Sequence, residues 1–181
     1  MKFKFKFIFV MSVMLIGLPS MIQAEDHSSF NVGYSDWDFD GANGDSLDLG
    51  FESVSGNIRW GVGAAVADID YVGDVNVYSI GADYGFGDWG AGTPYVGLFY
   101  GDSDLADGDV YYTVGYGKSS ATEVNFDFSV TDCSDCYDNS VNFNISWPVG
   151  GGNFIGIGYG TELTSVADDI DVISINYSRK W

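Results

Sequence analysis

Alternation of apolar and polar residues constrains this chain more than any other feature of its sequence. In the segment 122–130, Val124, Phe126 and Phe128 take every second position, with Asn125 and Asp127 between them. The same period of two recurs at 141–147 and at 173–177. A period of two places successive side chains on opposite faces of a β-strand. The pattern therefore predicts strands with one apolar face and one polar face.

About ten such segments follow residue 29, and turn-forming residues separate them. They lie at roughly 30–39, 46–53, 58–67, 75–86, 95–102, 109–117, 121–130, 138–147, 153–161 and 171–181. Most are near the roughly nine to eleven residues that a tilted membrane strand needs. The sequence predicts an all-β fold, an up-and-down antiparallel transmembrane β-barrel of about ten strands, with eight strands as the alternative count. An even number of strands places both termini at one end, the periplasmic one.

Glycine positions indicate which face of these strands points inward. The polar face also carries glycines, at Gly61, Gly63, Gly81, Gly85, Gly115, Gly117, Gly156, Gly158 and Gly160. A soluble core lined with glycine would be poorly packed, whereas the polar interior of a membrane barrel tolerates glycine. We therefore expect the bulky apolar face to contact lipid.

Aromatic residues near the ends of the predicted strands support a membrane location. One group is Trp60, Phe86, Tyr95, Tyr116, Trp147, Phe154 and Trp181, and the other is Tyr71, Tyr100, Tyr111, Phe128 and Tyr159. Membrane barrels carry aromatic girdles at both interfaces, although strands favour these residues anyway. We interpret the two groups as girdles.

Acidic residues gather in alternate connectors. The connectors after the first, third, fifth, seventh and ninth predicted strands hold most of the 26 acidic residues, while the other connectors hold only Asp88. Alternate connectors of an up-and-down barrel lie at opposite ends, so one end is expected to be densely acidic. A surface of this charge excludes nucleic acid as a partner, because nucleic acid binds basic patches.

Residues 1–24 have the features of a secretory signal peptide. Three lysines stand among the first six residues, an apolar run covers 7–18, and Ile22-Gln23-Ala24 offers a cleavage site. The run is too short to cross a bilayer as a helix, which takes about 20 residues. We expect cleavage after Ala24, which leaves 25–181 as a single barrel domain.

The last predicted strand carries a second signal. Ile173, Ile175 and Tyr177 alternate toward Trp181. With the signal peptide and the strand repeat, this ending resembles the small outer-membrane β-barrels of Gram-negative bacteria, the OmpA-like and porin-like group. Members of that group end on an aromatic residue preceded by alternating apolar positions, which the barrel-assembly machinery reads; Arg179 departs from this pattern. The resemblance implies an outer-membrane location, with outer-membrane lipids, lipopolysaccharide and the assembly machinery as partners.

Charged residues on the inward face define a candidate lumen site. They are Asp48, Glu52, Arg59, Asp83, Glu123 and Asp127, with Lys180 near the rim. One interpretation is a narrow cation-favouring path, because acidic rings select cations. The other is a salt-bridged plug, since buried charges need partners and side chains still fill much of a barrel of this size. We favour the plug.

An incomplete calcium motif lies at the acidic end. Asp36, Asp38 and Asp40 precede Gly41, as in the opening of a calcium loop, but Leu47 occupies the position of the bidentate glutamate. We expect weak binding of Ca²⁺ or Mg²⁺ across the acidic rim instead of a specific site, and no other cofactor.

Cys133 and Cys136 are expected to pair in a disulfide, as is usual in an oxidising compartment. A metal site would need further thiolate or imidazole ligands, and a redox motif would need a βαβ context. The single histidine, His27, precedes the first predicted strand and is expected to be a disordered terminal residue. Barrel enzymes that hydrolyse or transfer acyl groups use a histidine base, so enzymatic activity is not expected.

These observations favour a monomeric outer-membrane barrel with a structural or surface-interaction role in the cell envelope. Its acidic extracellular rim is expected to associate with divalent cations. A small cation-favouring pore is the alternative function.

Overall fold

A computed structural model describes residues 26–39, 42–87, 89–104, 106–133, 139–163 and 170–181. These residues form ten strands: β1 (His27–Phe39), β2 (Ala42–Ser55), β3 (Ile58–Ile69), β4 (Gly73–Gly85), β5 (Thr93–Ser103), β6 (Ala106–Lys118), β7 (Asn125–Cys133), β8 (Asn139–Gly150), β9 (Asn153–Leu163) and β10 (Ile170–Lys180). No helix in the described part of the chain is long and apolar enough to span a bilayer. Residues 1–24, which we predicted to be a signal peptide, lie outside the described residues.

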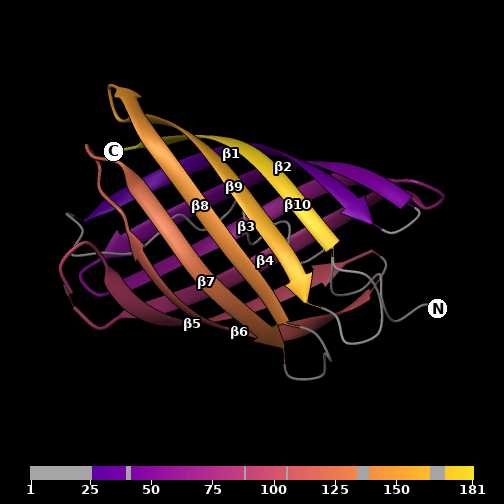
Figure 1. Ribbon diagram of the computed structural model, residues 1–181, viewed down its shortest axis with the longest axis horizontal. Helices are drawn as coiled ribbons and strands as arrows, with labels where there is room; N and C mark the ends of the chain where they lie inside the picture. The colour runs from indigo at the N-terminus through magenta and orange to yellow at the C-terminus, as the bar shows by residue number, and fades with distance from the viewer. Residues whose placement is uncertain (1–25, 40–41, 88, 105, 134–138, 164–169) are drawn as a thin grey trace.

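The ten strands close into one antiparallel barrel (Figure 1). Each strand pairs with the next in sequence, and β10 pairs with β1. The up-and-down barrel predicted from the alternation is therefore confirmed, with ten strands and not the eight of the alternative count. We call the end that holds Trp181 the periplasmic end and the opposite end the extracellular end, following the orientation predicted from the even number of strands.

The strands are tilted with respect to the barrel axis. A row of paired residues that starts at His27 in β1 can be followed through all ten strands, and it returns to β1 near Asp38, at the other end of that strand. Such a stagger is what closure of a tilted sheet requires.

The outer wall is apolar on every strand. Exposed outward residues at mid-barrel include Leu49, Ile80, Val114, Ile157 and Ile175. The positions between them face inward and carry serine, asparagine, glycine and the charged residues described below. This is the arrangement of a barrel surrounded by lipid, and it is the reverse of a soluble sandwich.

Inward glycines accommodate large side chains of neighbouring strands. A Cβ added at Gly81 would lie 2.0 Å from the Phe99 ring, and one added at Gly115 would lie 2.4 Å from the Tyr95 ring. The sequence predicted that glycine is tolerated inside the barrel. The structure shows a stronger reason, because the rings of β5 occupy the space that these residues leave on β4 and β6.

Strand β7 begins later than its sequence pattern predicted. The alternation suggested 121–130, whereas the strand covers Asn125–Cys133 and the first of its residues to pair with β6 is Phe126, opposite Lys118. In the preceding segment the Ser120 hydroxyl accepts hydrogen bonds from the N–H groups of Thr122 (3.2 Å) and Glu123 (3.1 Å). Serine bonded in this way competes with a strand ladder for backbone donors.

Candidate functional site

A charged cluster lies inside the barrel toward its periplasmic end. Arg59 of β3 is its centre: Nε donates to Asp83 of β4 at 2.6 Å, and Nη2 also contacts the same carboxylate. Glu52 of β2 lies 3.8 Å from Nη1 of Arg59. All three side chains face inward and are 3% exposed or less. Neighbouring strands bring them together because Glu52, Arg59 and Asp83 stand near one another in the ladder.

Tyr95 of β5 extends this cluster along the inner face of the barrel toward β7. Its hydroxyl donates to Asp127 of β7 at 2.8 Å, and the Arg59 guanidinium lies 5.3 Å from the centre of its ring. A cation over an aromatic face is a favourable contact, particularly away from water. We define the lumen cluster as Glu52, Arg59, Asp83, Tyr95 and Asp127.

Three aromatic residues that we predicted in the interfacial girdles point inward instead. Tyr95, Phe154 and Tyr111 are buried at 3%, 0% and 3% exposure, so the girdle assignment is wrong for them. The error has a simple cause, since strand-end position alone does not say which face a residue occupies. Their phase relative to outward Val96, Ile155 and Tyr112 would have placed them correctly.

Carboxylates outnumber their donors in the lumen cluster. Within the described residues, neither carboxylate oxygen of Glu52 accepts a hydrogen bond, and neither does Oδ1 of Asp83. Buried polar atoms are usually hydrogen-bonded, so free acceptor oxygens call for water or a cation. The cluster thus combines a salt-bridged core with unused acceptors.

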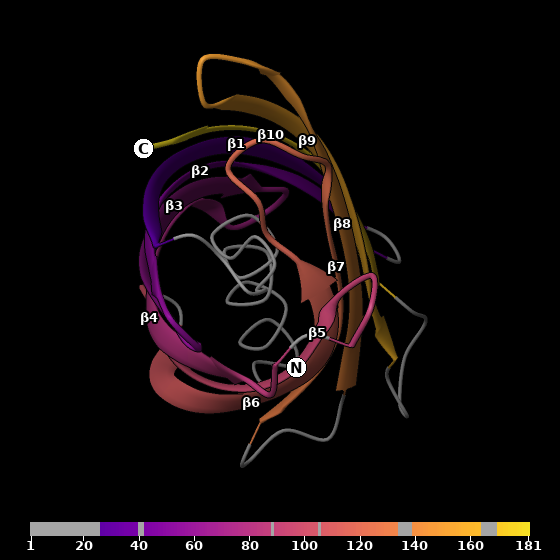
Figure 2. The ribbon, with the colours of Figure 1, turned by 90° about the vertical axis from the view of Figure 1, so that its left-hand side faces the viewer.

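The connector between β6 and β7 reaches across the periplasmic mouth to this region. Ser119 lies 3.4 Å from Nε2 of His27 on β1 and accepts a 2.9 Å hydrogen bond from Nζ of Lys180 on β10. The same ammonium donates to the Ser120 carbonyl at 3.1 Å. In the strand ring β6 is opposite β1, so these contacts cross the lumen. Figure 2, which looks onto this end, shows the connector reaching toward β1 and β10.

His27 is not the terminal disordered residue that we predicted. It begins β1, faces inward at 6% exposure and lies 3.9 Å from Glu52. The sequence held a signal for this position, because His27 lies in the same alternation as Ser29 and Asn31, which face inward. The arrangement is not that of a hydrolase triad, because Ser119 and Glu52 approach the same ring nitrogen, whereas a triad uses both.

Two predicted lumen residues lie away from the cluster. Asp48 faces inward on β2, nearer the extracellular end, and accepts a hydrogen bond from Ser46 at 3.1 Å. Glu123 is not in the lumen: it lies in the exposed connector and pairs with Lys118. The ammonium of Lys118 lowers the pKa of Glu123 by hydrogen bonding and by its charge. The prediction for Glu123 was wrong because the strand alternation does not extend to it.

Aspartates face outward at the extracellular end. Asp36 of β1 is opposite Asp45 of β2, which is opposite Asp68 of β3, which in turn is opposite Asp74 of β4. All four are exposed, and we call them the outer aspartate row. Like charges on directly opposite residues destabilise a sheet.

The inward side chains at this level are apolar, which sequence reasoning missed. Trp37, Ile69 and Val75 are each 1% exposed and Val172 is 5% exposed. Along β1 the outward residue changes from Tyr34 to Asp36 while the inward residue changes from Ser35 to Trp37. The walls at this end therefore follow the rule for a soluble protein, with charge outside and apolar side chains inside.

The other motifs at the extracellular end are only partly described. Asp36 and Asp38 belong to extended β1 and so do not curl around an ion as a calcium loop does, and Asp40 lies outside the described residues. The described residues hold no group of three or more acidic, histidine or cysteine ligands that suits a metal ion. Cys133 ends β7 and Cys136 lies outside the described residues, so the disulfide stays a prediction.

The C-terminal signal residues lie on the lipid-facing wall. Ile173, Ile175 and Tyr177 of β10 point outward and are 61%, 60% and 43% exposed, and Trp181 follows the strand at 64%. Arg179 shares this outer face near the periplasmic end. A long basic side chain at that level reaches the interface while its stem stays in the apolar region.

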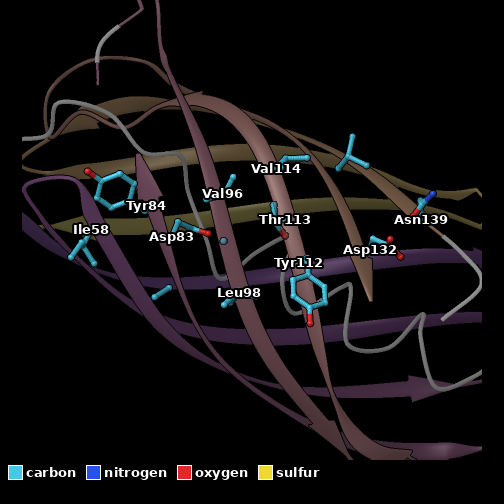
Figure 3. A pocket seen from close by; sticks show the side chains of 13 residues that line it. Ile58, Asp83, Tyr84, Val96, Leu98, Tyr112, Thr113, Val114, Asp132 and Asn139 are labelled. Carbon is cyan, nitrogen blue, oxygen red and sulfur yellow. The ribbon is translucent and has the colours of Figure 1, made fainter. Parts of the chain in front are cut away.

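An apolar groove of about 870 Å³ also lies on the barrel wall (Figure 3). Outward residues form most of its lining, among them Tyr84 of β4, Leu98 of β5 and Tyr112 and Val114 of β6, and Asp83 contributes to it from the inward face. Most of the groove therefore belongs to the lipid-facing surface and not to the lumen.

No family model matches the sequence, and no curated protein sequence matches it. Solved structures do align with it. Neisserial surface protein A is 17% identical, with 86% of this chain and 97% of that chain covered and a TM-score of 0.41. The KdgM porin in complex with disordered oligogalacturonate is 9% identical (83% and 98% covered, TM-score 0.48). The translocator domain of the autotransporter NalP from Neisseria meningitidis is 8% identical (85% and 87% covered, TM-score 0.45).

The closed antiparallel ring and its apolar outer wall are themselves the features of a membrane barrel. This chain folds as a ten-stranded transmembrane β-barrel.

Proposed function

We propose that the protein is a structural component of the outer membrane that associates with lipopolysaccharide through divalent cations at its acidic rim. The outer aspartate row carries this proposal. Its four carboxylates face away from the barrel just beyond the apolar wall, the level at which outer-leaflet headgroups lie. Aspartates and lipid phosphates repel each other, and Ca²⁺ or Mg²⁺ between them removes the repulsion because both are oxygen ligands.

Hydrogen bonding distinguishes the row from three other acids at this end. Asp70 accepts a bond from the Asn43 N–H at 3.2 Å, Asp104 from the Asn76 amide at 2.7 Å, and Asp171 from the Tyr159 hydroxyl at 2.6 Å. No such bond to the four row carboxylates occurs in the described part of the chain. The row carboxylates therefore stand to gain from a counter-ion supplied by the membrane.

The lumen supports a structural role over an open pore. The lumen cluster joins β2, β3, β4, β5 and β7, and the β6–β7 connector spans the periplasmic mouth. Cross-lumen contacts of this kind brace a barrel. We propose no catalytic role for His27, given its geometry, and we propose that the barrel acts as a monomer delivered by the assembly machinery through its C-terminal signal.

Vesicles with and without lipopolysaccharide test the proposal. The mature protein is folded into each, and its melting midpoint is read from heat-modifiable gel migration with Ca²⁺ or with a chelator. We expect Ca²⁺ to raise the melting midpoint only in the vesicles that contain lipopolysaccharide. The fourfold variant D36N/D45N/D68N/D74N should lose most of that rise.

The inward carboxylate gives a matched control for this experiment. Asp48→Asn removes one acid from the same barrel without touching the outer wall, so its Ca²⁺ response should equal that of the unmodified protein. An equal Ca²⁺ response in the fourfold variant, or in vesicles lacking lipopolysaccharide, would contradict the proposal.

A small cation-favouring pore is the second candidate, and the excess of carboxylates in the lumen cluster is the observation that favours it. Steady cation-selective current through the unmodified protein, altered by Glu52→Gln and Asp127→Asn, would support this candidate over a purely structural role.

A further inference from the structure

The β6–β7 connector, residues 119–124, forms a strap across the periplasmic mouth of the lumen. It leaves β6 at Lys118 and enters β7 at Asn125, yet its first residues contact β1 and β10 on the opposite wall. A two-residue hairpin would have sufficed to join two antiparallel neighbours. The extra length therefore serves the contact across the mouth, not the turn.

Lys180 makes the main attachment of the strap. The Lys180 ammonium donates to the Ser119 hydroxyl at 2.9 Å and to the Ser120 carbonyl at 3.1 Å, and it lies 5.0 Å from the centre of the Phe154 ring. Its side chain is buried at 4% exposure. Charge-assisted hydrogen bonds are stronger than neutral ones, so Lys180 dominates the attachment.

The strap is a compact unit with few other attachments. The Ser120 hydroxyl accepts from Thr122 and Glu123, and the Asn125 side chain accepts from the Ser120 N–H. These bonds lie within the strap and its base on β7. Across the mouth, the bonds to Lys180 and the contact between Ser119 and His27 hold it. Release of those contacts allows the strap to swing as one piece about its two ends.

The lumen cluster lies beyond the strap, with carboxylate oxygens that accept no hydrogen bond in the described residues. Glu52 contributes two such oxygens and Asp83 one. Carboxylate oxygens that accept no hydrogen bond favour cations, while a lysine ammonium at the mouth opposes the entry of cations. Lys180 therefore acts twice, because it ties the strap and places a positive charge at the entrance.

We propose that the strap is a gate with Lys180 as its latch, and that its release opens a cation-selective path past the lumen cluster. This goes beyond the proposed structural role and rests on the second candidate function, the small cation-favouring pore. The closed form is the one described here, and small monovalent cations such as K⁺ are the class of ion that the open form conducts.

Planar-bilayer recording of the mature protein in KCl tests the gate. We expect rare, brief openings, and we expect Lys180→Gln to raise the open probability about tenfold or more, the order of effect of losing a charged hydrogen bond. Arg179→Gln is the matched control: it removes the same charge from the adjacent residue, which faces outward, and should leave the record unchanged. Adding Glu52→Gln and Asp127→Asn to the Lys180 variant should reduce its preference for K⁺ over Cl⁻.

A second variant does not depend on Lys180. Because Lys118 pairs with Phe126, replacing residues 119–125 by Asn-Gly closes a tight hairpin and removes the strap. This variant should conduct continuously while keeping heat-modifiable migration. If it folds and stays as silent as the unmodified protein, there is no gated path. Steady conduction by the unmodified protein, or equal records for the Lys180 and Arg179 variants, would equally overturn the proposal.

Discussion

The two ends of the barrel place charge on opposite sides of the same wall. At the periplasmic end the charges of Glu52, Arg59 and Asp83 point inward, and apolar residues such as Trp60 cover the outside. At the extracellular end the outer aspartate row points outward, and Trp37, with other apolar residues, fills the inside. One alternating pattern runs through both ends, and only its polarity reverses.

This reversal marks where the wall leaves the lipid. It occurs between Leu47 and Asp45 on β2, between Val66 and Asp68 on β3, and between Ile173 and Asp171 on β10. Below it the strands have lipid outside, and above it they have water. The strands thus continue past the bilayer as a short soluble barrel with its own small apolar core.

The largest expected effect comes from unpairing the charges of the periplasmic end. Arg59→Met leaves Glu52 and Asp83 buried without their cation, which costs about 3–5 kcal/mol. Urea unfolding in lipid vesicles, followed by heat-modifiable migration, measures this loss. The triple change R59M/E52L/D83L should recover most of the loss because no isolated charge remains; no recovery would mean that the cluster stabilises by more than charge pairing.

Truncating the inward tryptophan of the extracellular end should cost about 3 kcal/mol, as for a large buried side chain. Trp37→Ala removes a side chain that is 1% exposed, whereas Trp60→Ala removes one that is 45% exposed on the outer wall. The same unfolding assay compares them, and we expect the Trp60 variant to lose clearly less. Equal losses would contradict a separate apolar core at this end.

A basic residue on the outer wall tests the position of the boundary. Ile157→Arg places a charge midway along β9 in the lipid-facing band and should cost about 2–4 kcal/mol. Asp68→Arg, beyond the boundary, should be neutral or slightly stabilising because it relieves repulsion with Asp45 and Asp74. Unfolding free energies in vesicles measure both, and similar costs at the two sites would place the boundary elsewhere.

The smallest effect is expected outside the barrel, at Glu123. Lys118 lowers the pKa of this exposed carboxyl, so any stabilisation is present at neutral pH and is lost as the pH falls through the lowered value. Exposed pairs contribute little, and Glu123→Gln should leave the unfolding midpoint unchanged at pH 7 and at pH 4. A measurable drop would show that the strap depends on this pair as well as on Lys180.

Alternation was sufficient to predict the barrel because it reports the face of each residue directly. The inward positions of Asp48, Glu52, Arg59, Asp83 and Asp127 followed from phase alone. Phase says nothing about partners across the lumen, which depend on register and tilt. The contact of Ser119 with His27 joins residues 92 positions apart, and no local pattern encodes it.

The missed apolar core had a different cause. The sequence was interpreted with one inside-out rule along the full strand length, and that rule holds only within lipid. At Asp36 and Trp37 the alternation continues with the faces exchanged, because the polar residue points outward and the apolar residue points inward. Outward aspartates in phase with inward apolar residues are the local sign of the change, and they could be sought in other barrel sequences.

The pairing of β1 with β10 means that the barrel can close only after its last strand has formed. Ser28 and Trp181 exchange two backbone hydrogen bonds of 3.0 Å, and the seam between the two strands extends from there to Asp38 and Asp171. The free edge of β1, the first strand, therefore gains its hydrogen-bond partners only when β10, the last strand, pairs with it. Until β1 and β10 pair, every folding intermediate has two open strand edges, and open edges can pair with the wrong neighbour.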